Sequence, residues 1–293
     1  MPVLRDLEIG LMFWGERNPR LAIRGMKSLG LRCGQLGIAG HVPIDEVAPL
    51  WKAALAEEDF SVTTIFAAYE GESYADMPTV RRTVGFIPPA TRAAREARTL
   101  RVIDLGAGLG VPGFATHIGF VPDDKSDPDY EAAIGIVRKI CDYAARRNMT
   151  FALETGQESA GALKEFIEDA DRDNLRINFD SANLILYGTG DPIEALKLLG
   201  PWVASVHVKD GNWPPPDRPG ALGTEMPLGE GSVGIDRFVA ALKALGYKGP
   251  LTIEREVSLE QEMDDRHKEG LSHLDDIRNA IRLLERLLTG DYS

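Results

Sequence analysis

The chain has 293 residues, of which 44% are hydrophobic and 27% are charged, a composition that excludes a disordered or fibrous protein. Its formal net charge of −12 argues against a partner bound through a phosphate backbone, because nucleic-acid-binding surfaces are normally basic. Two cysteines, Cys33 and Cys141, are too few for a disulfide scaffold and fit a reducing cytoplasm, and no signal peptide or membrane span is expected.

Short apolar segments alternate with longer segments of helical period along the whole chain. The predicted strands cover residues 7–13, 31–38, 60–68, 113–121, 150–154, 175–180, 203–208 and 250–254. Helical periodicity covers residues 44–57, 129–147, 160–170, 192–199, 235–245 and 271–288. The strands are apolar throughout, as a parallel sheet buried on both faces requires. Eight such alternations without a break in composition predict a single (β/α)8 TIM barrel, with residues 1–293 forming one domain.

The segment VIDLGAGLG, residues 102–110, is similar to the glycine-rich loop of S-adenosylmethionine methyltransferases. A 3.6-residue period nevertheless runs into it through Ala93, Ala97, Leu100, Ile103 and Ala107. This period favours the end of a helix, with Gly106, Gly108 and Gly110 as its terminators. Another strand follows, so the segment lacks the strand–loop–helix context of a cofactor loop, and we predict no cofactor site there.

Four polar residues stand where predicted strands end: Glu154 in FALETGQE, Asp180 in INFDSAN, His207 in SVHVKDGN and Glu254 in LTIERE. The first two intervals are 26 and 27 residues, about one strand-plus-helix unit of a barrel, and a Pro/Gly-rich insertion at 211–233 lengthens the third. Buried carboxylates that converge need a cation between them. Three carboxylates and one imidazole favour Mn²⁺, with Mg²⁺, Co²⁺ or Zn²⁺ as alternatives.

These segments, most clearly from Phe151 to Glu256, resemble the xylose isomerase-like TIM-barrel superfamily, in the group called sugar phosphate isomerases/epimerases. That group also contains ketose 3-epimerases, hydroxypyruvate isomerases and inosose dehydratases. The resemblance implies that Glu154, Asp180, His207 and Glu254 bind one divalent cation. It also implies that Glu154 and Glu254 are the catalytic acid/base pair.

The activity that this resemblance implies is that of a divalent-metal-dependent sugar isomerase or epimerase. Such an enzyme abstracts the proton α to a carbonyl and proceeds through a metal-stabilised enediolate. The alternative on the same scaffold is a metal-dependent keto-sugar or keto-inositol dehydratase or lyase, in which a β-hydroxyl leaves after the same proton abstraction.

Two positions depart from the epimerase pattern. Asn183 and Trp213 stand where those enzymes carry a histidine and an arginine that touch the substrate, which leaves 3-epimerase specificity open. Both remain candidate substrate-binding residues. Trp14 and Trp213 follow the first and seventh predicted strands and would either form walls of the sugar pocket by stacking or simply pack as lids.

Three further residues are candidates for substrate binding, each with an ordinary structural alternative. Glu158 would bind a substrate hydroxyl or serve as a charge at a helix N-terminus. Lys209 would neutralise an alkoxide or form a core ion pair with Asp210 or Glu230. His117 would reach the substrate or be a hydrogen-bonded core histidine.

Two loops carry weaker signals. GEGSVG, residues 229–234, precedes a helix predicted to start at Ile235 and would suit a phosphate bound by backbone N–H groups. Arg237 is the only basic residue nearby, which favours an ordinary loop-to-helix connection and a non-phosphorylated substrate. Glu70 and Glu72, after the third strand, are expected to be solvated.

A nuclease like endonuclease IV shares the barrel but needs a multi-metal cluster built largely from histidines. This chain has five, of which His41, His267 and His273 fall in loops or in the last helix. The acidic net charge also argues against a nuclease.

The expected partner is a small sugar or keto-polyol, with no nucleic acid and no membrane. The protein is expected to be cytoplasmic and to form a homodimer or homotetramer.

Overall fold

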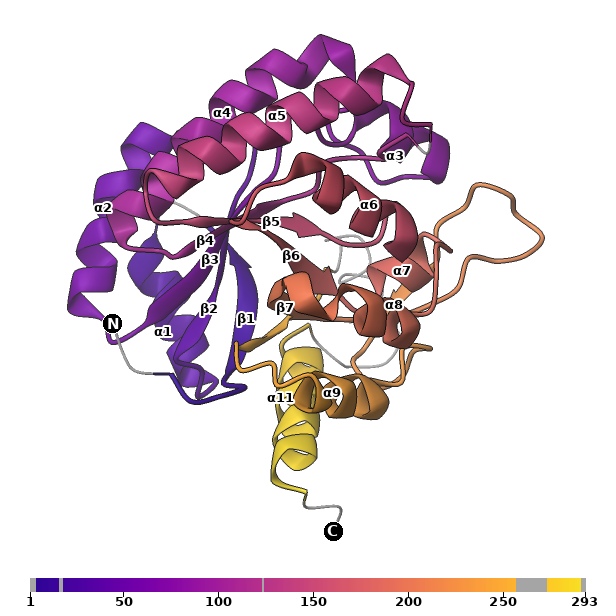
Figure 1. Ribbon diagram of the computed structural model, residues 1–293. Coiled ribbons are helices and arrows are strands. Elements are labelled where there is room, and N and C mark those ends of the chain that lie inside the picture. Colours follow the sequence, from indigo (N-terminus) through magenta and orange to yellow (C-terminus); the bar gives the residue numbers. More distant parts are fainter. Residues whose placement is uncertain (1–3, 16–17, 123, 257–272, 291–293) are drawn as a thin grey trace.

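The computed structural model describes residues 4–15, 18–122, 124–256 and 273–290. Its central strands are β1 (Ile9–Trp14), β2 (Cys33–Ile38), β3 (Ser61–Ala67), β4 (Gly113–Thr116), β5 (Thr150–Glu154), β6 (Leu175–Asp180), β7 (Val203–Val208) and β10 (Leu251–Ile253). They form a closed parallel barrel in the order β1-β10-β7-β6-β5-β4-β3-β2 (Figure 1). The predicted (β/α)8 TIM barrel is confirmed.

Helices surround this barrel and connect its strands (Figure 1). They are α1 (Pro19–Ser28), α2 (Ile44–Glu57), α3 (Met77–Thr83), α4 (Pro89–Leu109), α5 (Pro128–Ala145), α6 (Ala160–Ala170), α7 (Asn183–Leu186), α8 (Pro192–Leu199), α9 (Ile235–Ala244) and α11 (His273–Thr289), with a 3₁₀ turn at Gly200–Trp202. Among the described residues, none of these helices combines the length and the hydropathy needed to cross a bilayer.

The predicted helix boundaries agree best with the structure for helices that have a clear apolar face. Residues 44–57, 160–170 and 192–199 are helical over the predicted lengths. The fourth strand is shorter than predicted and ends at Thr116, because Ile118 accepts a hydrogen bond from the Phe86 N–H outside the barrel and Gly119 has φ +89°. The predicted start of the last helix at residue 271, and His267, lie outside the described residues.

Helix α4 corrects the prediction for the glycine-rich segment. The segment does end a helix, but Gly106 and Gly108 lie inside α4 and are not terminators. Gly110 alone ends the helix, in the left-handed conformation with φ 75°. Gly106 permits a close approach there, since a Cβ on it would lie 2.8 Å from Ile65 Cγ2. Glycine thus serves packing at one position and chain reversal at another.

The insertion after β7 contains a hairpin that the sequence pattern does not reveal. Its strands, β8 (Asp210–Asn212) and β9 (Thr224–Met226), pair antiparallel. The orange loop that joins them projects from the barrel in Figure 1. Backbone contacts hold this insertion in place, since the Met77 N–H at the start of α3 donates to the Gly220 carbonyl at 2.9 Å.

Candidate metal centre

Four polar side chains converge at the carboxyl ends of neighbouring strands. Glu154 and Asp180 are the last residues of β5 and β6, His207 lies in β7 beside Asp180, and Glu254 directly follows β10. Each is buried, with at most 8% of its surface exposed. The sequence predicted this convergence, because parallel strands present their carboxyl ends at one edge of the barrel.

The geometry of these four side chains fits one cation. One ligand atom from each residue can be chosen so that all four lie within 4.8 Å of one another. His207 Nδ1 lies 3.1 Å from Glu154 Oε1, 3.2 Å from Glu254 Oε2 and 3.9 Å from Asp180 Oδ2. Two atoms that are each about 2.1 Å from the same ion lie at most about 4.2 Å apart, so the three distances from His207 Nδ1 are compatible with a shared ion.

Asp180 provides a second indication of a cation site. Its Oδ1 accepts hydrogen bonds from the backbone N–H groups of Ala182 and Asn183, at 2.7 and 2.8 Å. Its Oδ2 is buried and has no hydrogen-bond partner in the described part of the chain. An unpartnered buried carboxylate oxygen is costly, and a cation would satisfy it. The donor set therefore fits a divalent cation that prefers oxygen ligands.

Burial and neighbouring charges oppose each other at this centre. Burial lowers the pKa of His207, but the nearby carboxylates of Glu154 and Glu254 outweigh it and raise that pKa well above its usual value. Burial raises the pKa of Glu254, but His207 and Lys209 hold it well below the ordinary range. The pKa of Asp180 is well above its usual value because of burial, with Glu254 and Glu154 adding to the shift. The site therefore favours a positive charge at its centre.

Lys209 is buried beside this centre and corrects one expectation. Its Nζ lies 3.2 Å from Glu254 Oε2 and 2.9 Å from Glu256 Oε2, and its side chain is 4% exposed. The anticipated core ion pair exists, but its partners are Glu254, Glu256 and, at 3.9 Å, Glu225, and not Asp210 or Glu230. Lys209 is thus placed to orient Glu254 and to keep it ionised.

Asn183 lies at the start of α7 and contacts two of the four residues. Its backbone N–H donates to Asp180, and its Nδ2 donates to Glu154 Oε1 at 3.4 Å. The position that departs from the epimerase pattern therefore lies within the site. Trp14 ends β1 and Trp213 follows β8, and these residues are 40% and 46% exposed.

Glu158 and His117 carry buried polar atoms with unmet hydrogen bonds. Glu158 directly precedes Ser159, the N-cap of α6, as the helix N-terminus alternative predicts, but it is buried, with 6% of its surface exposed. Burial raises the pKa of Glu158 to about 8, and its Oε1 has no partner among the described residues. His117 Nδ1 is likewise buried and has no partner among the described residues, and its ring lies 5.7 Å from that of Phe66.

Glu72 corrects another expectation. Its side chain is only 6% exposed and accepts hydrogen bonds from the backbone N–H groups of Tyr69 and Gly85, at 3.0 and 2.8 Å. Burial raises the pKa of Glu72. Glu70, in contrast, is exposed as expected. Glu72 therefore fastens the loop after β3 and is not a solvated charge.

The loop GEGSVG is occupied by a side chain of the protein itself. The Asp210 carboxylate accepts hydrogen bonds from the N–H groups of Gly229, Gly231 and Val233, at 2.9, 3.0 and 3.1 Å. Backbone donors that already bind a carboxylate are not available to a phosphate. The structure therefore favours the ordinary loop-to-helix connection at this position.

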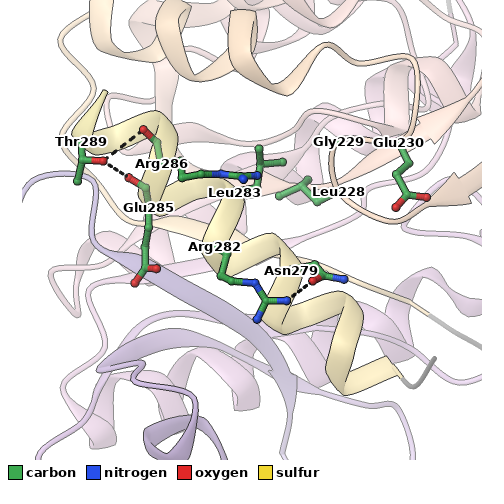
Figure 2. Close-up of a pocket in the computed structure, with 9 residues that line it drawn as sticks. All are labelled: Leu228, Gly229, Glu230, Asn279, Arg282, Leu283, Glu285, Arg286 and Thr289. Atoms are coloured by element: carbon green, nitrogen blue, oxygen red, sulfur yellow. Dashed lines mark hydrogen bonds between the residues drawn. The ribbon is translucent and has the colours of Figure 1, made fainter. Parts of the chain in front are cut away.

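A pocket elsewhere on the molecule contains none of the four converging residues. It lies between α11 and residues 228–230, and Figure 2 shows its lining. Arg282 there donates a hydrogen bond to the Asn279 side chain, and Thr289 bonds to backbone carbonyls of its own helix. Charged groups of both signs surround an open groove, so we place the functional site at the strand ends.

Two residues of the site region were missed by sequence reasoning. Gln35 and Asn178 are fully buried polar residues inside β2 and β6, below the four converging side chains. Asn178 Nδ2 donates to Glu154 Oε2 at 2.7 Å, and Gln35 Oε1 lies 3.1 Å from His207 Nε2. The available signal was a single amide in each strand, Gln35 in CGQLGI and Asn178 in LRINFD.

Comparisons with known proteins agree with this fold. The sequence matches the family model described as xylose isomerase-like TIM barrel over residues 23–277. A xylose isomerase domain protein from Planctomyces limnophilus is 38% identical, with 96% of this chain and 97% of that chain covered and a TM-score of 0.84. None of the curated proteins matches this sequence.

More distant solved structures share the fold alone. A D-allulose 3-epimerase from Methylomonas sp., in complex with D-allulose, is 17% identical over 98% of this chain and 99% of that one, with a TM-score of 0.69. A xylose isomerase-like TIM barrel protein from Mycobacterium smegmatis, in complex with magnesium, is 19% identical over 94% and 89%, with a TM-score of 0.66. Together with the family match, the fold and the buried carboxylate–imidazole group lead to one conclusion: this chain belongs to the xylose isomerase-like TIM-barrel family.

Proposed function

We propose that the protein is a divalent-metal-dependent sugar isomerase or epimerase that abstracts a proton from the carbon next to a carbonyl. One observation carries the proposal: two buried glutamates reach the same imidazole nitrogen, with Glu154 and Glu254 oxygens 3.1 and 3.2 Å from His207 Nδ1. Their strands, β5 and β10, are separated by β6 and β7 in the barrel. The two carboxylates therefore approach from different sides, as an acid/base pair acting on one carbon requires.

Glu154, Asp180, His207 and Glu254 would hold the cation. When bound there, a divalent cation polarises a carbonyl and stabilises the negative charge that develops as the proton leaves. The support in this structure is the close approach of the four ligand atoms and the buried, unpartnered Oδ2 of Asp180. Mn²⁺ is the proposed ion, with Mg²⁺, Co²⁺ and Zn²⁺ as alternatives.

Glu254 is the proposed base. Although burial raises its pKa, His207 and Lys209 hold that pKa well below the ordinary value, so Glu254 is ionised at neutral pH and can accept a proton. Glu154 is the proposed partner, fixed by hydrogen bonds from Asn178 and Asn183. A proton returned to the opposite face of the same carbon gives an epimer, and one returned to the neighbouring carbon gives an aldose–ketose isomer.

Unmet hydrogen bonds support a polyhydroxy substrate. Glu158 Oε1, His117 Nδ1 and Gln157 Nε2 are buried polar atoms without partners among the described residues. Buried polar atoms of this kind are normally satisfied, and the hydroxyl groups of a sugar or keto-polyol would satisfy them. Trp14 and Trp213 are proposed as walls of the pocket mouth.

Proton exchange tests the proposal directly. The protein loaded with Mn²⁺ is incubated in D₂O with ketoses, aldoses and keto-inositols, and products are identified by NMR and mass spectrometry. We expect deuterium at the α-carbon together with an epimer or isomer. We also expect losses of about 10²–10⁴-fold in E154Q and E254Q. E57Q, which changes an exposed glutamate, is the matched control.

The outcomes separate the candidates. Products that have lost one water would favour the dehydratase or lyase. The proposal is wrong if the protein binds Mn²⁺ but exchanges no α-proton of any sugar in the panel, or if E254Q is as active as the wild type.

A further inference from the structure

A chain of buried hydrogen bonds runs beneath the four converging side chains. Asn178 Nδ2 donates to Glu154 Oε2 at 2.7 Å, and Gln35 Nε2 donates to Asn178 Oδ1 at 3.1 Å. Gln35 Oε1 in turn lies 3.1 Å from His207 Nε2. Gln35, Asn178 and His207 are each 0% exposed, so these hydrogen bonds are buried within the barrel.

The donor and acceptor in each of these hydrogen bonds follow from the chemistry of the Glu154 carboxylate, where the series begins. A carboxylate oxygen only accepts hydrogen bonds, so Asn178 must turn its NH₂ group toward Glu154. Its oxygen then faces Gln35, which must donate with its own NH₂ group, and the Gln35 oxygen is left facing His207. An amide oxygen only accepts, so His207 must carry a hydrogen on Nε2. Nδ1 is thereby the nitrogen that faces Glu154 and Glu254.

Two irregularities in the barrel place these amides. The pairing of β2 with β3 shifts register between Gly34 and Gln35, and the pairing of β6 with β7 shifts between Ile177 and Asn178. A register shift changes the direction in which the following side chain points, and such shifts are enriched beside active sites. Gly34 is required at the first of them, because a Cβ there would lie 2.3 Å from the Leu11 carbonyl oxygen.

We propose that Gln35 is a positioning residue that, through Asn178, keeps the hydrogen of His207 on Nε2 and so presents Nδ1 to the cation. This inference rests on the proposed metal centre and extends it to a residue on the opposite side of the imidazole. Gln35 touches neither substrate nor cation; it acts by fixing the ring orientation and the tautomer of a ligand. Outer-shell partners of this kind typically contribute 10–100-fold to metal affinity.

A substitution that tests Gln35 must fill the volume of its side chain. A pocket at the amino-terminal end of the barrel is lined by Gln35, Ser205 and Thr252, so a small residue at position 35 would let water replace the amide. Q35M keeps the length of the side chain and removes both hydrogen-bonding groups. T252V is the matched control, because Thr252 Oγ1 accepts a weaker bond of 3.4 Å from Gln35 Nε2 and does not set the direction of the chain.

Two measurements test the proposal. The first is the Kd for Mn²⁺ by calorimetry, with thermal melting as a check on folding. We expect Q35M to bind one Mn²⁺ with a Kd about 10–100-fold higher than the wild type, and T252V to keep the wild-type Kd. The second is the ¹⁵N-histidine NMR spectrum of the Cd²⁺-loaded wild type, with His207 assigned through H207Q. We expect Cd²⁺ on Nδ1 and a hydrogen on Nε2.

Each outcome decides the matter. A wild-type spectrum with Cd²⁺ on Nε2 overturns the inference, even if Q35M does not fold. A folded Q35M that binds Mn²⁺ as tightly as the wild type also overturns it and leaves the proposed metal centre standing. A wild type that binds neither ion refutes the metal centre itself, and the inference with it.

Discussion

Glu158 is a buried acidic side chain whose protonation should contribute to stability near neutral pH. Burial raises its pKa from 4.5 to about 8, so between these two pH values the folded protein keeps a proton that the unfolded chain has released. Raising the pH across this window therefore destabilises the fold, by at most about 1.4 kcal/mol per pH unit for one group. Below about pH 4.5 both states are protonated and the effect vanishes.

The variant E158Q should remove this contribution. Urea unfolding between pH 5 and pH 8 is expected to show wild-type stability falling relative to that of E158Q as the pH rises. E70Q, which removes an exposed carboxylate from a loop at the same end of the barrel, is the matched control. Parallel pH profiles for the wild type and E158Q would show that Glu158 titrates normally.

At the level of single residues, the sequence predicts the four candidate ligands better than the residues that support them. Glu154, Asp180, His207 and Glu254 could be found because each stands where an apolar strand stops. Gln35 and Asn178 could not, because their direction depends on register shifts that no residue pattern encodes. The partners of Lys209 were missed for a similar reason: Glu256 lies beside it only once β7 and β10 are paired.

Within α4, two glycines should respond oppositely to the same substitution. A Cβ on Gly108 meets nothing within 4 Å, so G108A should stabilise the protein by about 0.5–1 kcal/mol through helix propensity. A Cβ on Gly106 would lie 2.8 Å from Ile65 and 2.9 Å from Met149, so G106A should cost about 1–3 kcal/mol by overpacking. Urea unfolding measures both; a G106A that stabilises as much as G108A would contradict this account of the helix.

Asp210 holds the loop that leads into α9. Besides Gly229, Gly231 and Val233, its carboxylate accepts from the Gly211 N–H at 2.9 Å. D210A would leave these donors unpaired and should destabilise the protein by at least about 3 kcal/mol. It should also speed amide hydrogen exchange at the three loop residues.

D217A is the comparison for this loop, because Asp217 is exposed on the same insertion. We expect its effect to be within about 0.5 kcal/mol of zero. Equal effects of D210A and D217A would mean that the carboxylate does not organise the loop.

Among the elements, the barrel strands and the long helices could be predicted, and the β8–β9 hairpin could not. Helices α2, α6 and α8 show an apolar face of clear period, which residue types alone reveal. The hairpin has three-residue strands without alternating apolar positions, and it forms because Asp210 and neighbouring loops hold it. Short elements of this kind depend on tertiary contacts.

For the molecule as a whole, a bound cation should be a major source of stability. A ligand that binds only the folded state at 1,000 times its Kd adds about 4.1 kcal/mol, so saturating Mn²⁺ should raise the Tm by several degrees. EDTA should reverse this rise, and D180N, which alters the unpartnered ligand oxygen, should abolish most of it. Differential scanning calorimetry with and without Mn²⁺ provides the measurement. An equal rise in D180N would place the ion elsewhere.

The pairing of β1 with β10 closes the ring of strands, and Glu254 directly follows β10. A growing polypeptide that has emerged only as far as β7 therefore carries three of the four proposed ligands and two unpaired sheet edges. The strand that seals the cylinder also delivers the last carboxylate. Closure of the sheet and completion of the proposed metal centre therefore depend on the same segment, so an unfinished chain lacks the full set of proposed ligands.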